Sequence, residues 1–269
     1  MKIGIVGLGL IGGSLFKKLS QSDNDIYAVT RNKKTIENAK QYSKNVSNNY
    51  ETLKSCDVVF VASPINKTLE VLDILENIVS KDCIVLDCSS VKEFVMQKKR
   101  QYKFIGSHPM AGTENSGFNA SFEELFAGAK WVLTPTEETQ KEDIETIKNI
   151  IKLTGAEVVI ADAKEHDSAV ALISHMPLLL AQAIFNSAKD NKLALKLASS
   201  GFRDMTRLAM SNIEMANDMR TYNSKNIDLA LEKVFTSIDI LKNNNDLEIF
   251  NKIKNTRKNM YSTDGKNIL

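Results

Sequence analysis

Cysteine is scarce in this chain, and its scarcity excludes two kinds of site. The three cysteines, Cys56, Cys83 and Cys88, show no C-x-x-C spacing, so we expect neither a disulfide framework nor a metal site. Cys83 and Cys88 lie an odd number of residues apart on one expected strand, which points their side chains to opposite faces. A reducing, cytoplasmic location fits this pattern.

An excess of charge of one sign is also missing. The 35 lysines and arginines nearly balance the 33 acidic residues and leave a net charge of +2, so we expect neither nucleic acid nor a membrane surface as a partner. No uninterrupted apolar run reaches the ~18 residues of a membrane span. With 43% apolar residues, the composition is typical of a soluble globular protein.

A glycine-rich turn stands at the start of the chain. An apolar strand at 2–6 runs into Gly7-x-Gly9-x-x-Gly12, and an apolar-periodic helix over 10–19 follows. Gly7 permits the tight turn, Gly9 lets the backbone approach a pyrophosphate, and Gly12 lets the helix pack on the sheet. A purely structural turn is the alternative to a dinucleotide site. The residues expected to bind the dinucleotide here are Gly7, Leu8, Gly9, Leu10, Ile11 and Gly12.

The pattern of apolar residues predicts two domains. Strand-like runs alternate with helical patterns, which is typical of a parallel, doubly wound α/β sheet. Ten of the twelve glycines precede Ala156, and long helical stretches begin at Asp162. We therefore predict a Rossmann-type dinucleotide-binding domain over 1–161 and an all-helical domain over 162–269. The expected strands after the first are 26–29, 58–62, 83–87, 104–107, 131–134 and 158–160.

The expected helical domain opens with a capping box, Asp162 to Glu165. The helix that continues to Phe185 is apolar nearly all round, so it must be buried on most sides. A later helix carries an apolar seam over 227–241. Core packing and a subunit interface both explain these helices, and an interface would make the protein a homodimer.

The end of the second strand bears on the choice of cofactor. NAD-selective folds place an acid there to bind the ribose 2′-hydroxyl, but this chain has Thr30 and Arg31, with Lys33 and Lys34 beside them. A guanidinium offers a planar fork of donors to a 2′-phosphate. We expect a preference for NADP, with NAD possible if Arg31 is only an exposed turn residue.

Other polar segments also follow strand ends, the edge at which open α/β sheets bind ligands. Ser63-Pro64 follows one strand, and Ser89-Ser90-Val91-Lys92 follows the next. Ordinary turns and helix caps would use the same residue types. We interpret Ser63 and Pro64 as a second part of the cofactor site.

A histidine in a rigid turn is the strongest candidate for a catalytic residue in the sequence. His108 precedes Pro109 and lies between Gly106 and Gly112, and its side chain suits proton transfer at neutral pH. The alternative is a histidine that only stabilises the turn. Glu114 in the same loop either gates the pocket or is plain surface charge.

The helical half offers further candidates. Asp204 and Arg207 lie three apart, which fits either a helix cap with a local ion pair or a clamp for a substrate carboxylate. His175 lies in the apolar helix, where a hydrogen-bonded core histidine is the plainer interpretation. For His166, between two acids, we expect a surface position.

Seven segments, taken in order, resemble the prephenate and arogenate dehydrogenase family. They are Gly7-Leu-Gly-Leu-Ile-Gly-Gly-Ser14, Ser90-Val-Lys92, Ser107-His-Pro-Met-Ala-Gly-Thr113, Val132-Leu-Thr-Pro-Thr136, Glu165-His-Asp167, Ser174-His-Met-Pro177 and Ser200-Gly-Phe-Arg-Asp-Met-Thr-Arg207. The resemblance implies a Rossmann domain, a helical dimerisation domain and oxidative decarboxylation of a cyclohexadienyl substrate on the route to tyrosine. The chain resembles the short form of the family, without a regulatory or mutase domain.

The resemblance also implies roles for single residues. His108 would take the proton of the ring hydroxyl as hydride leaves for the nicotinamide, and Ser90 would orient His108. Arg207 would hold a substrate carboxylate and Asp204 would position Arg207. The residues that would face the rest of the substrate are His175, Thr113 and Glu114.

The chain departs from many relatives after Arg207. The stretch Ser211-Asn-Ile-Glu-Met-Ala216 lacks the Pro and Trp of a Ser-x-Pro-x-x-Trp pattern and looks more like arogenate-accepting members, although prephenate and arogenate both stay open. Two other hypotheses remain: a Rossmann reductase of a hydroxy or imino acid, and a non-catalytic protein that senses a dinucleotide.

Overall fold

The computed structural model describes residues 1–243 and 246–260. The chain divides into two compact units, one over 1–227 and one that begins at Asp228. The first unit contains the sheet and every candidate site residue named above, so the candidate site lies within this unit alone.

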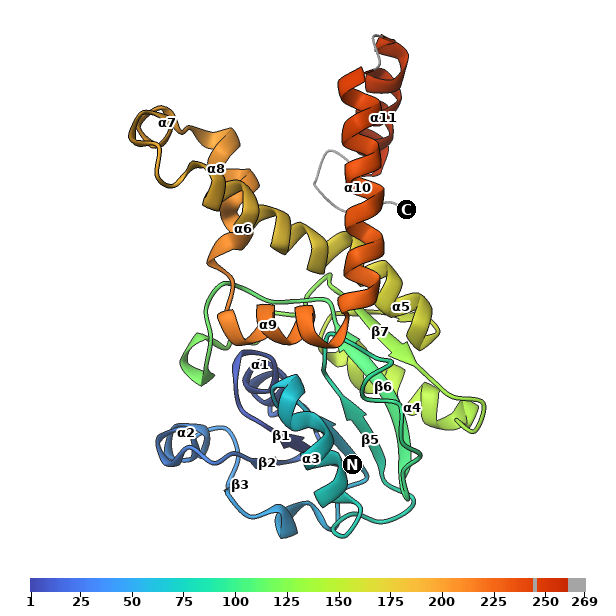
Figure 1. The fold of residues 1–269 in the computed structure, drawn as a ribbon. Coiled ribbons are helices and arrows are strands. Elements are labelled where there is room, and N and C mark those ends of the chain that lie inside the picture. The colour runs from blue at the N-terminus through green and yellow to red at the C-terminus, as the bar shows by residue number, and fades with distance from the viewer. Residues whose placement is uncertain (244–245, 261–269) are drawn as a thin grey trace. The chain divides into compact units, whose positions relative to one another are not determined.

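An eight-stranded sheet forms the centre of the first unit (Figure 1), in the order β3-β2-β1-β4-β5-β6-β7-β8. The strands are β1 (Lys2–Val6), β2 (Asp25–Val29), β3 (Asn45–Ser47), β4 (Val58–Val61), β5 (Ile84–Asp87), β6 (Lys103–Pro109), β7 (Lys130–Thr134) and β8 (Glu157–Ile160). The predicted α/β fold class is confirmed, with two differences. The short strand β3 was not predicted, and β7 runs antiparallel to β6 although all other neighbours are parallel.

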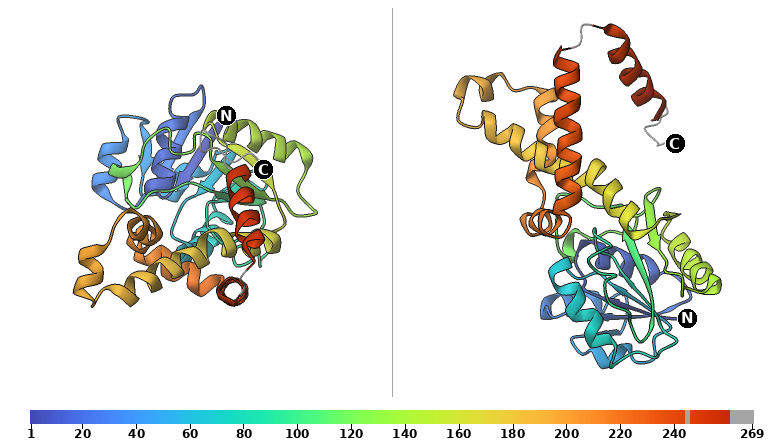
Figure 2. Two further views of the ribbon diagram at one scale, coloured as in Figure 1. Left: turned by 90° about the horizontal axis from the view of Figure 1, so that it is seen from above. Right: turned by 45° about the vertical axis from the view of Figure 1, so that its right-hand side comes forward.

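Helices follow most strands and then dominate the chain after residue 162 (Figures 1 and 2). The α-helices of the first part are α1 (Leu10–Leu19), α2 (Lys33–Ala39), α3 (Ile65–Leu75) and α4 (Lys141–Leu153). Those of the later part are α5 (Ala163–Val170), α6 (Met176–Ala188), α7 (Lys192–Leu197), α8 (Ser200–Thr206), α9 (Ile213–Tyr222), α10 (Ser224–Asn243) and α11 (Leu247–Met260). The remaining short helical segments are η1 (Tyr50–Leu53), η2 (Phe118–Ala120), η3 (Ala171–His175) and η4 (Arg207–Met210).

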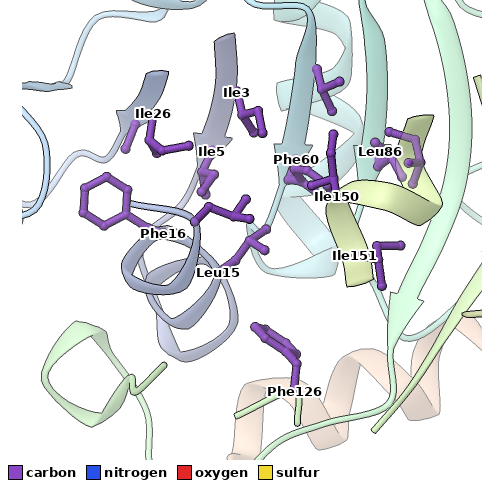
Figure 3. Packing of buried hydrophobic residues seen from close by; sticks show 14 of the residues in the cluster. Ile3, Ile5, Leu15, Phe16, Ile26, Phe60, Leu86, Phe126, Ile150 and Ile151 are labelled. Carbon is purple, nitrogen blue, oxygen red and sulfur yellow. The ribbon is translucent and has the colours of Figure 1, made fainter. Parts of the chain in front are cut away.

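The sheet has an apolar core on each face, as a doubly wound sheet requires. One core joins strand residues such as Ile5 and Phe60 to Leu15 of α1 and Ile150 of α4 (Figure 3). The other joins alternate strand residues to Leu72 of α3 and its neighbours. Cys83 packs in the second core and Cys88 against the first, so their predicted placement on opposite faces is confirmed.

The segment from α5 to α6 is one continuous helical stretch, and the structure shows the Asp162 half of the predicted capping box. Asp162 caps it by accepting the backbone N–H groups of Lys164 at 2.8 Å and Glu165 at 3.3 Å. An 18-residue window of the stretch Ala163–Ala188 has a mean hydropathy of 1.7, and by length and composition the stretch is long and apolar enough to cross a membrane. This differs from our expectation that no segment reaches that threshold. Our expectation that this helix is buried on most sides is wrong for the single chain, because only 33% of that window is buried.

The strand order places a topological switch between β1 and β4. The chain leaves β1 towards β2 on one side, and β4 pairs on the other side of β1. Ligands of open α/β sheets bind beyond the carboxyl ends of strands at such a switch. The glycine turn and Ser63-Pro64 therefore lie at this edge.

Candidate active site

The glycine turn has the geometry that a dinucleotide requires. Gly7 has a φ of +89°, and a Cβ there would lie 2.7 Å from the carbonyl oxygen of Ala62. A Cβ at Gly12 would lie 1.9 Å from the Gly7 carbonyl oxygen, whereas one at Gly9 would meet no described atom within 4 Å. Gly9 also leaves the first N–H groups of α1 without a side-chain cap. The turn therefore offers free donors and open approach to an anion, which fits a pyrophosphate.

The end of β4 completes this edge. Ser63 Oγ lies 3.2 Å from Thr68 Oγ1, which lies 3.2 Å from Ser89 Oγ. These hydroxyls link the loop after β4 to the loop after β5. Pro64 leaves the start of α3 without a cap of its own, and Asp218 of α9 accepts the N–H of Asn66 there.

A buried ion pair anchors the loop after β5. Lys92 Nζ donates to the Asp87 carboxylate and to the Ser107 carbonyl, and both charged side chains are fully buried. Asp87 also accepts the N–H groups of Ser89 at 2.9 Å and Ser107 at 3.0 Å. Burial lowers the pKa of Lys92, although Asp87 opposes the shift. The pair fixes the residue that precedes His108.

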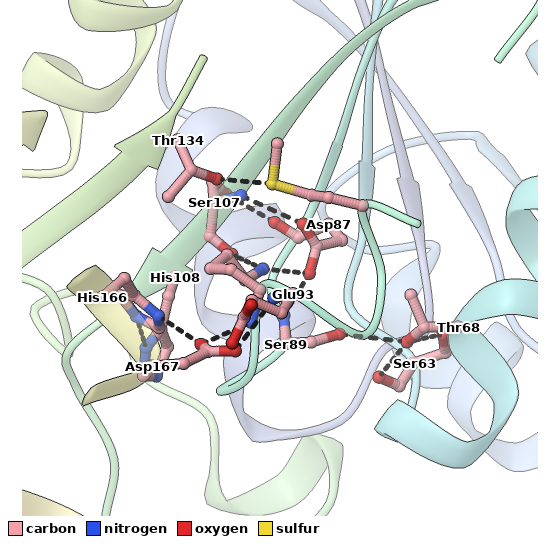
Figure 4. A network of polar contacts seen from close by, with 12 residues as sticks. Ser63, Thr68, Asp87, Ser89, Glu93, Ser107, His108, Thr134, His166 and Asp167 are labelled. Carbon is pink, nitrogen blue, oxygen red and sulfur yellow. Dashed lines mark hydrogen bonds and ion pairs between the residues drawn. The ribbon is translucent and has the colours of Figure 1, made fainter. Parts of the chain in front are cut away.

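A hydrogen-bonded chain of side chains stands at the end of β6 (Figure 4). His108 Nδ1 lies 2.9 Å from His166 Nε2, and His166 Nδ1 lies 2.8 Å from Asp167 Oδ1. Asp167 also accepts the backbone N–H groups of Lys92 at 2.7 Å and Glu93 at 2.9 Å. The start of the helical half is thereby tied to the sheet.

With both rings neutral, the chain of hydrogen bonds determines which ring nitrogens carry protons. A carboxylate only accepts, so His166 Nδ1 donates to Asp167 and neutral His166 presents Nε2 as an acceptor. His108 Nδ1 then donates to His166, and the lone pair of neutral His108 lies on Nε2. Nε2 is the atom that a general base needs to have free. Burial, aided by His166, Lys92 and His175, lowers the pKa of His108 well below its usual value, which keeps the ring neutral.

The position of His166 corrects our expectation. It was predicted at the surface, but it is 3% exposed because it shares a helix face with buried Val170, four residues later. That four-residue spacing was the sequence signal that its acidic neighbours obscured.

His175 is held by a different partner. Asn223 Nδ2 donates to the Asp167 carbonyl at 2.8 Å and lies 3.0 Å from His175 Nδ1. The carbonyl fixes the amide orientation, so His175 Nδ1 accepts and neutral His175 carries its proton on Nε2. This buried Nε2–H has no partner among the described residues. Burial lowers the pKa of His175 to about 4.

The other candidates in the loops after β5 and β6 make no described hydrogen bond to His108. Ser90 is partly buried, and no described hydrogen bond joins its side chain to His108; the bond that orients His108 comes from His166. Thr113 and Glu114 are exposed, and Thr113 Oγ1 accepts the N–H of Asn115 at 3.2 Å.

The expected pair between Asp204 and Arg207 is not formed. Asp204 lies inside α8 rather than at its cap, and its carboxylate meets Arg203 Nε at 3.4 Å. Arg207 begins η4 and is exposed, and no ion pair is recorded for it within the described ranges. The structure does not bring Arg207 into contact with His108.

The end of β2 is arranged as a turn. Thr30 donates its N–H to the Ser47 carbonyl at 3.0 Å, and Asn32 rather than Arg31 caps α2. Arg31 is exposed, as are Lys33 and Lys34. In the described part of the chain, no cluster of three or more ligand-type side chains could hold a metal.

The fold and the site fit a dinucleotide-dependent oxidoreductase, with a Rossmann-like domain and a hydrogen-bonded histidine at the carboxyl edge of its sheet. Residues 14–160 match the family profile "Prephenate dehydrogenase, nucleotide-binding domain", and 162–255 match "Prephenate dehydrogenase, dimerization domain". The chain belongs to the prephenate dehydrogenase family.

Individual relatives agree with this assignment. The prephenate dehydrogenase of Lactococcus lactis is 32% identical over 247 residues, which cover 87% of this chain and 67% of that protein. The structure of Synechocystis arogenate dehydrogenase is similar with a TM-score of 0.83 and 33% identity, over 96% of this chain and 98% of that one. Prephenate dehydrogenase from A. aeolicus, solved with hydroxyphenyl propionate and NAD+, has a TM-score of 0.85 and 29% identity, over 96% and 97%.

Proposed function

We propose that the protein catalyses the oxidative decarboxylation of prephenate, arogenate or both, with hydride transfer to NAD(P). The observation that carries this proposal is the neutral His108 with its free Nε2 at the sheet edge that also bears the glycine turn. Family membership supports the reaction class. A nicotinamide, when bound, supplies the hydride acceptor.

The residues of the chain have proposed roles in this reaction. His108 Nε2 accepts the proton of the ring hydroxyl, and Arg207 binds a substrate carboxylate through its guanidinium fork. Thr113 and Glu114 keep the substrate-facing roles that the family resemblance implies. Ser90 and Asp204 keep no orienting role in this proposal, because no described hydrogen bond or ion pair joins them to His108 and Arg207. Arg207 is exposed and no ion pair is described for it, so its guanidinium is open to an incoming carboxylate.

The unpaired Nε2–H of His175 supports a role in substrate binding. A buried donor without a partner gains a hydrogen bond from any ligand that places an oxygen beside it. The keto oxygen of prephenate accepts such a bond, whereas the ammonium group of arogenate does not. This donor therefore favours prephenate, in contrast to the stretch after Arg207.

We propose NADP as the preferred cofactor, bound through the turn of Gly7 to Gly12, through Ser63 and Pro64, and through Thr30 and Arg31. The absence of an acid at the end of β2 supports this choice, and the exposed Arg31 is free to meet a 2′-phosphate.

We also propose a cytoplasmic homodimer, with a domain boundary near residue 161. Large apolar side chains on the helical part are exposed, as unpartnered interface residues would be. They include Ile173, Leu193, Leu197, Met205, Met210 and Ile213. Light scattering at micromolar concentration should give the mass of two chains.

Assays of the purified protein with prephenate and with arogenate, each with NAD and with NADP, test the function. Turnover of neither substrate would refute it. His108→Asn should lower kcat by about 10²- to 10⁴-fold and leave cofactor affinity nearly unchanged, because it removes a positioned base. Near-normal turnover in that variant would make His108 a structural residue.

A further inference from the structure

The buried pair of His166 and Asp167 stands directly behind His108. The two side chains are 1% exposed, and each hydrogen bond of these side chains points to the other member, to His108 or to the loop at 92–93. A partner that only oriented His108 would need no more than one hydrogen-bond acceptor beside His108 Nδ1. Here that acceptor, His166, is itself hydrogen-bonded to the Asp167 carboxylate.

The chemistry of the proposed reaction requires a temporary place for one proton. The ring hydroxyl loses its proton while hydride leaves the same carbon. Loss of carbon dioxide from the ring carboxylate then turns that carbonyl oxygen into a phenolate, which takes a proton back. No proton is consumed or released overall, so the proton taken up in the first step can be the one that is returned in the last.

His108 alone is a poor store. Its burial disfavours the cationic ring, and Lys92 and His175 add further positive or potentially positive groups nearby. A cation on His166, by contrast, lies 2.8 Å from the Asp167 carboxylate, which stabilises it by direct attraction.

We propose that the proton taken by His108 is held on His166 beside Asp167 and returns by the same route, so that His166 and Asp167 form a proton store. The O–H bond of the substrate breaks as the Nε2–H bond of His108 forms. The Nδ1–H bond of His108 breaks as the Nε2–H bond of His166 forms, and the return reverses both transfers. This inference rests on the proposed function.

The variant His166→Gln separates storage from orientation. An amide can donate one hydrogen bond and accept another, as neutral imidazole does, so the substituted side chain can still link Asp167 to His108. It cannot take up a proton. His166→Phe removes both capacities and serves as the second variant.

The pH dependence of kcat/KM is the readout. The charged or titratable groups around His108 are His166, Lys92, His175, Asp87 and Asp167. For His166→Gln we expect kcat to fall about 10²-fold and the acid limb to move to lower pH, because burial lowers the pKa of His108 alone. Lowered kcat with an unmoved limb, or wild-type kcat, would overturn the proton store.

A second measurement does not depend on turnover. Long-range ¹H–¹⁵N spectra of the wild-type protein should show protonated Nδ1 and unprotonated Nε2 for both His108 and His166, assigned with the two His166 variants, whose folding is checked by circular dichroism and cofactor affinity. A proton on His108 Nε2 would overturn the inference. Absence of wild-type turnover with both substrates would refute the proposed function itself, and the spectra would still decide the hydrogen-bond chain.

Discussion

Replacing Lys92 with Met should destabilise the protein strongly while leaving side-chain length almost unchanged. Lys92 and Asp87 are both fully buried, and removal of one partner leaves the other charge uncompensated, which typically costs about 3–5 kcal/mol. Asp87 keeps its bonds from Ser89 and Ser107, so we expect the lower end, about 3 kcal/mol. The surface variant Lys98→Met is the matched control, because that lysine pairs with Asp73 while half exposed, and should cost less than about 1 kcal/mol.

Urea unfolding followed by tryptophan fluorescence measures this difference. The single tryptophan, Trp131, is fully buried, and its Nε1–H donates to Ser107 Oγ at 3.2 Å. It therefore reports on the residue whose carbonyl accepts from Lys92. A midpoint for Lys92→Met no lower than that for Lys98→Met would refute the reasoning. Adding Asp87→Asn to Lys92→Met should be less damaging than the sum of the single changes, because neither charge then lacks its partner.

The remaining predictions concern the substrate clamp, the cofactor and His175. Arg207→Ala should raise KM for the substrate by about 30-fold, the loss of about 2 kcal/mol from a charge-assisted pair; unchanged KM for both substrates would leave Arg207 a surface residue. Arg31→Ala should raise KM for NADP far more than KM for NAD, and a wild-type preference for NAD would contradict the cofactor proposal. The pKa of His175 is lowered from 6.5 to about 4, so the unfolded chain binds its proton first on acidification. The free energy of unfolding should therefore fall as pH falls from about 6.5 to about 4, by up to about 3 kcal/mol, and His175→Gln should flatten this slope in urea titrations at several pH values.

Local patterns in the sequence predicted most of the sheet and the glycine turn. β1 and α1 have the predicted bounds because the strand, the turn and the helix are specified by neighbouring residues. β3 was missed because only Val46 of its three residues is buried, which gives no alternation to detect. The antiparallel direction of β7 was also not predictable, since a buried strand has the same pattern in either direction.

The candidate site was predicted where it depends on local chemistry and missed where it depends on distant contacts. His108 was identified from its own turn, but its partner His166 lies 58 residues later in the chain. The failed pair of Asp204 and Arg207 has a local cause. Thr206 has φ −102° and ψ 2°, so α8 ends before Arg207. Asp204 and Arg207 therefore do not lie three residues apart on one α-helix face.

The hydrogen bonds from the loop at 92–93 to Asp167 join the loop after β5 to the start of α5. The glycine turn that we propose as the dinucleotide site lies in the first 12 residues, whereas the hydrogen-bond partner of the proposed base His108 is His166, on α5. A movement that separated the start of α5 from the sheet would leave the nucleotide turn intact and would free His108 to adopt either tautomer. Affinity for the dinucleotide can therefore survive changes that abolish proton chemistry, and saturation with cofactor is no measure of an assembled active site.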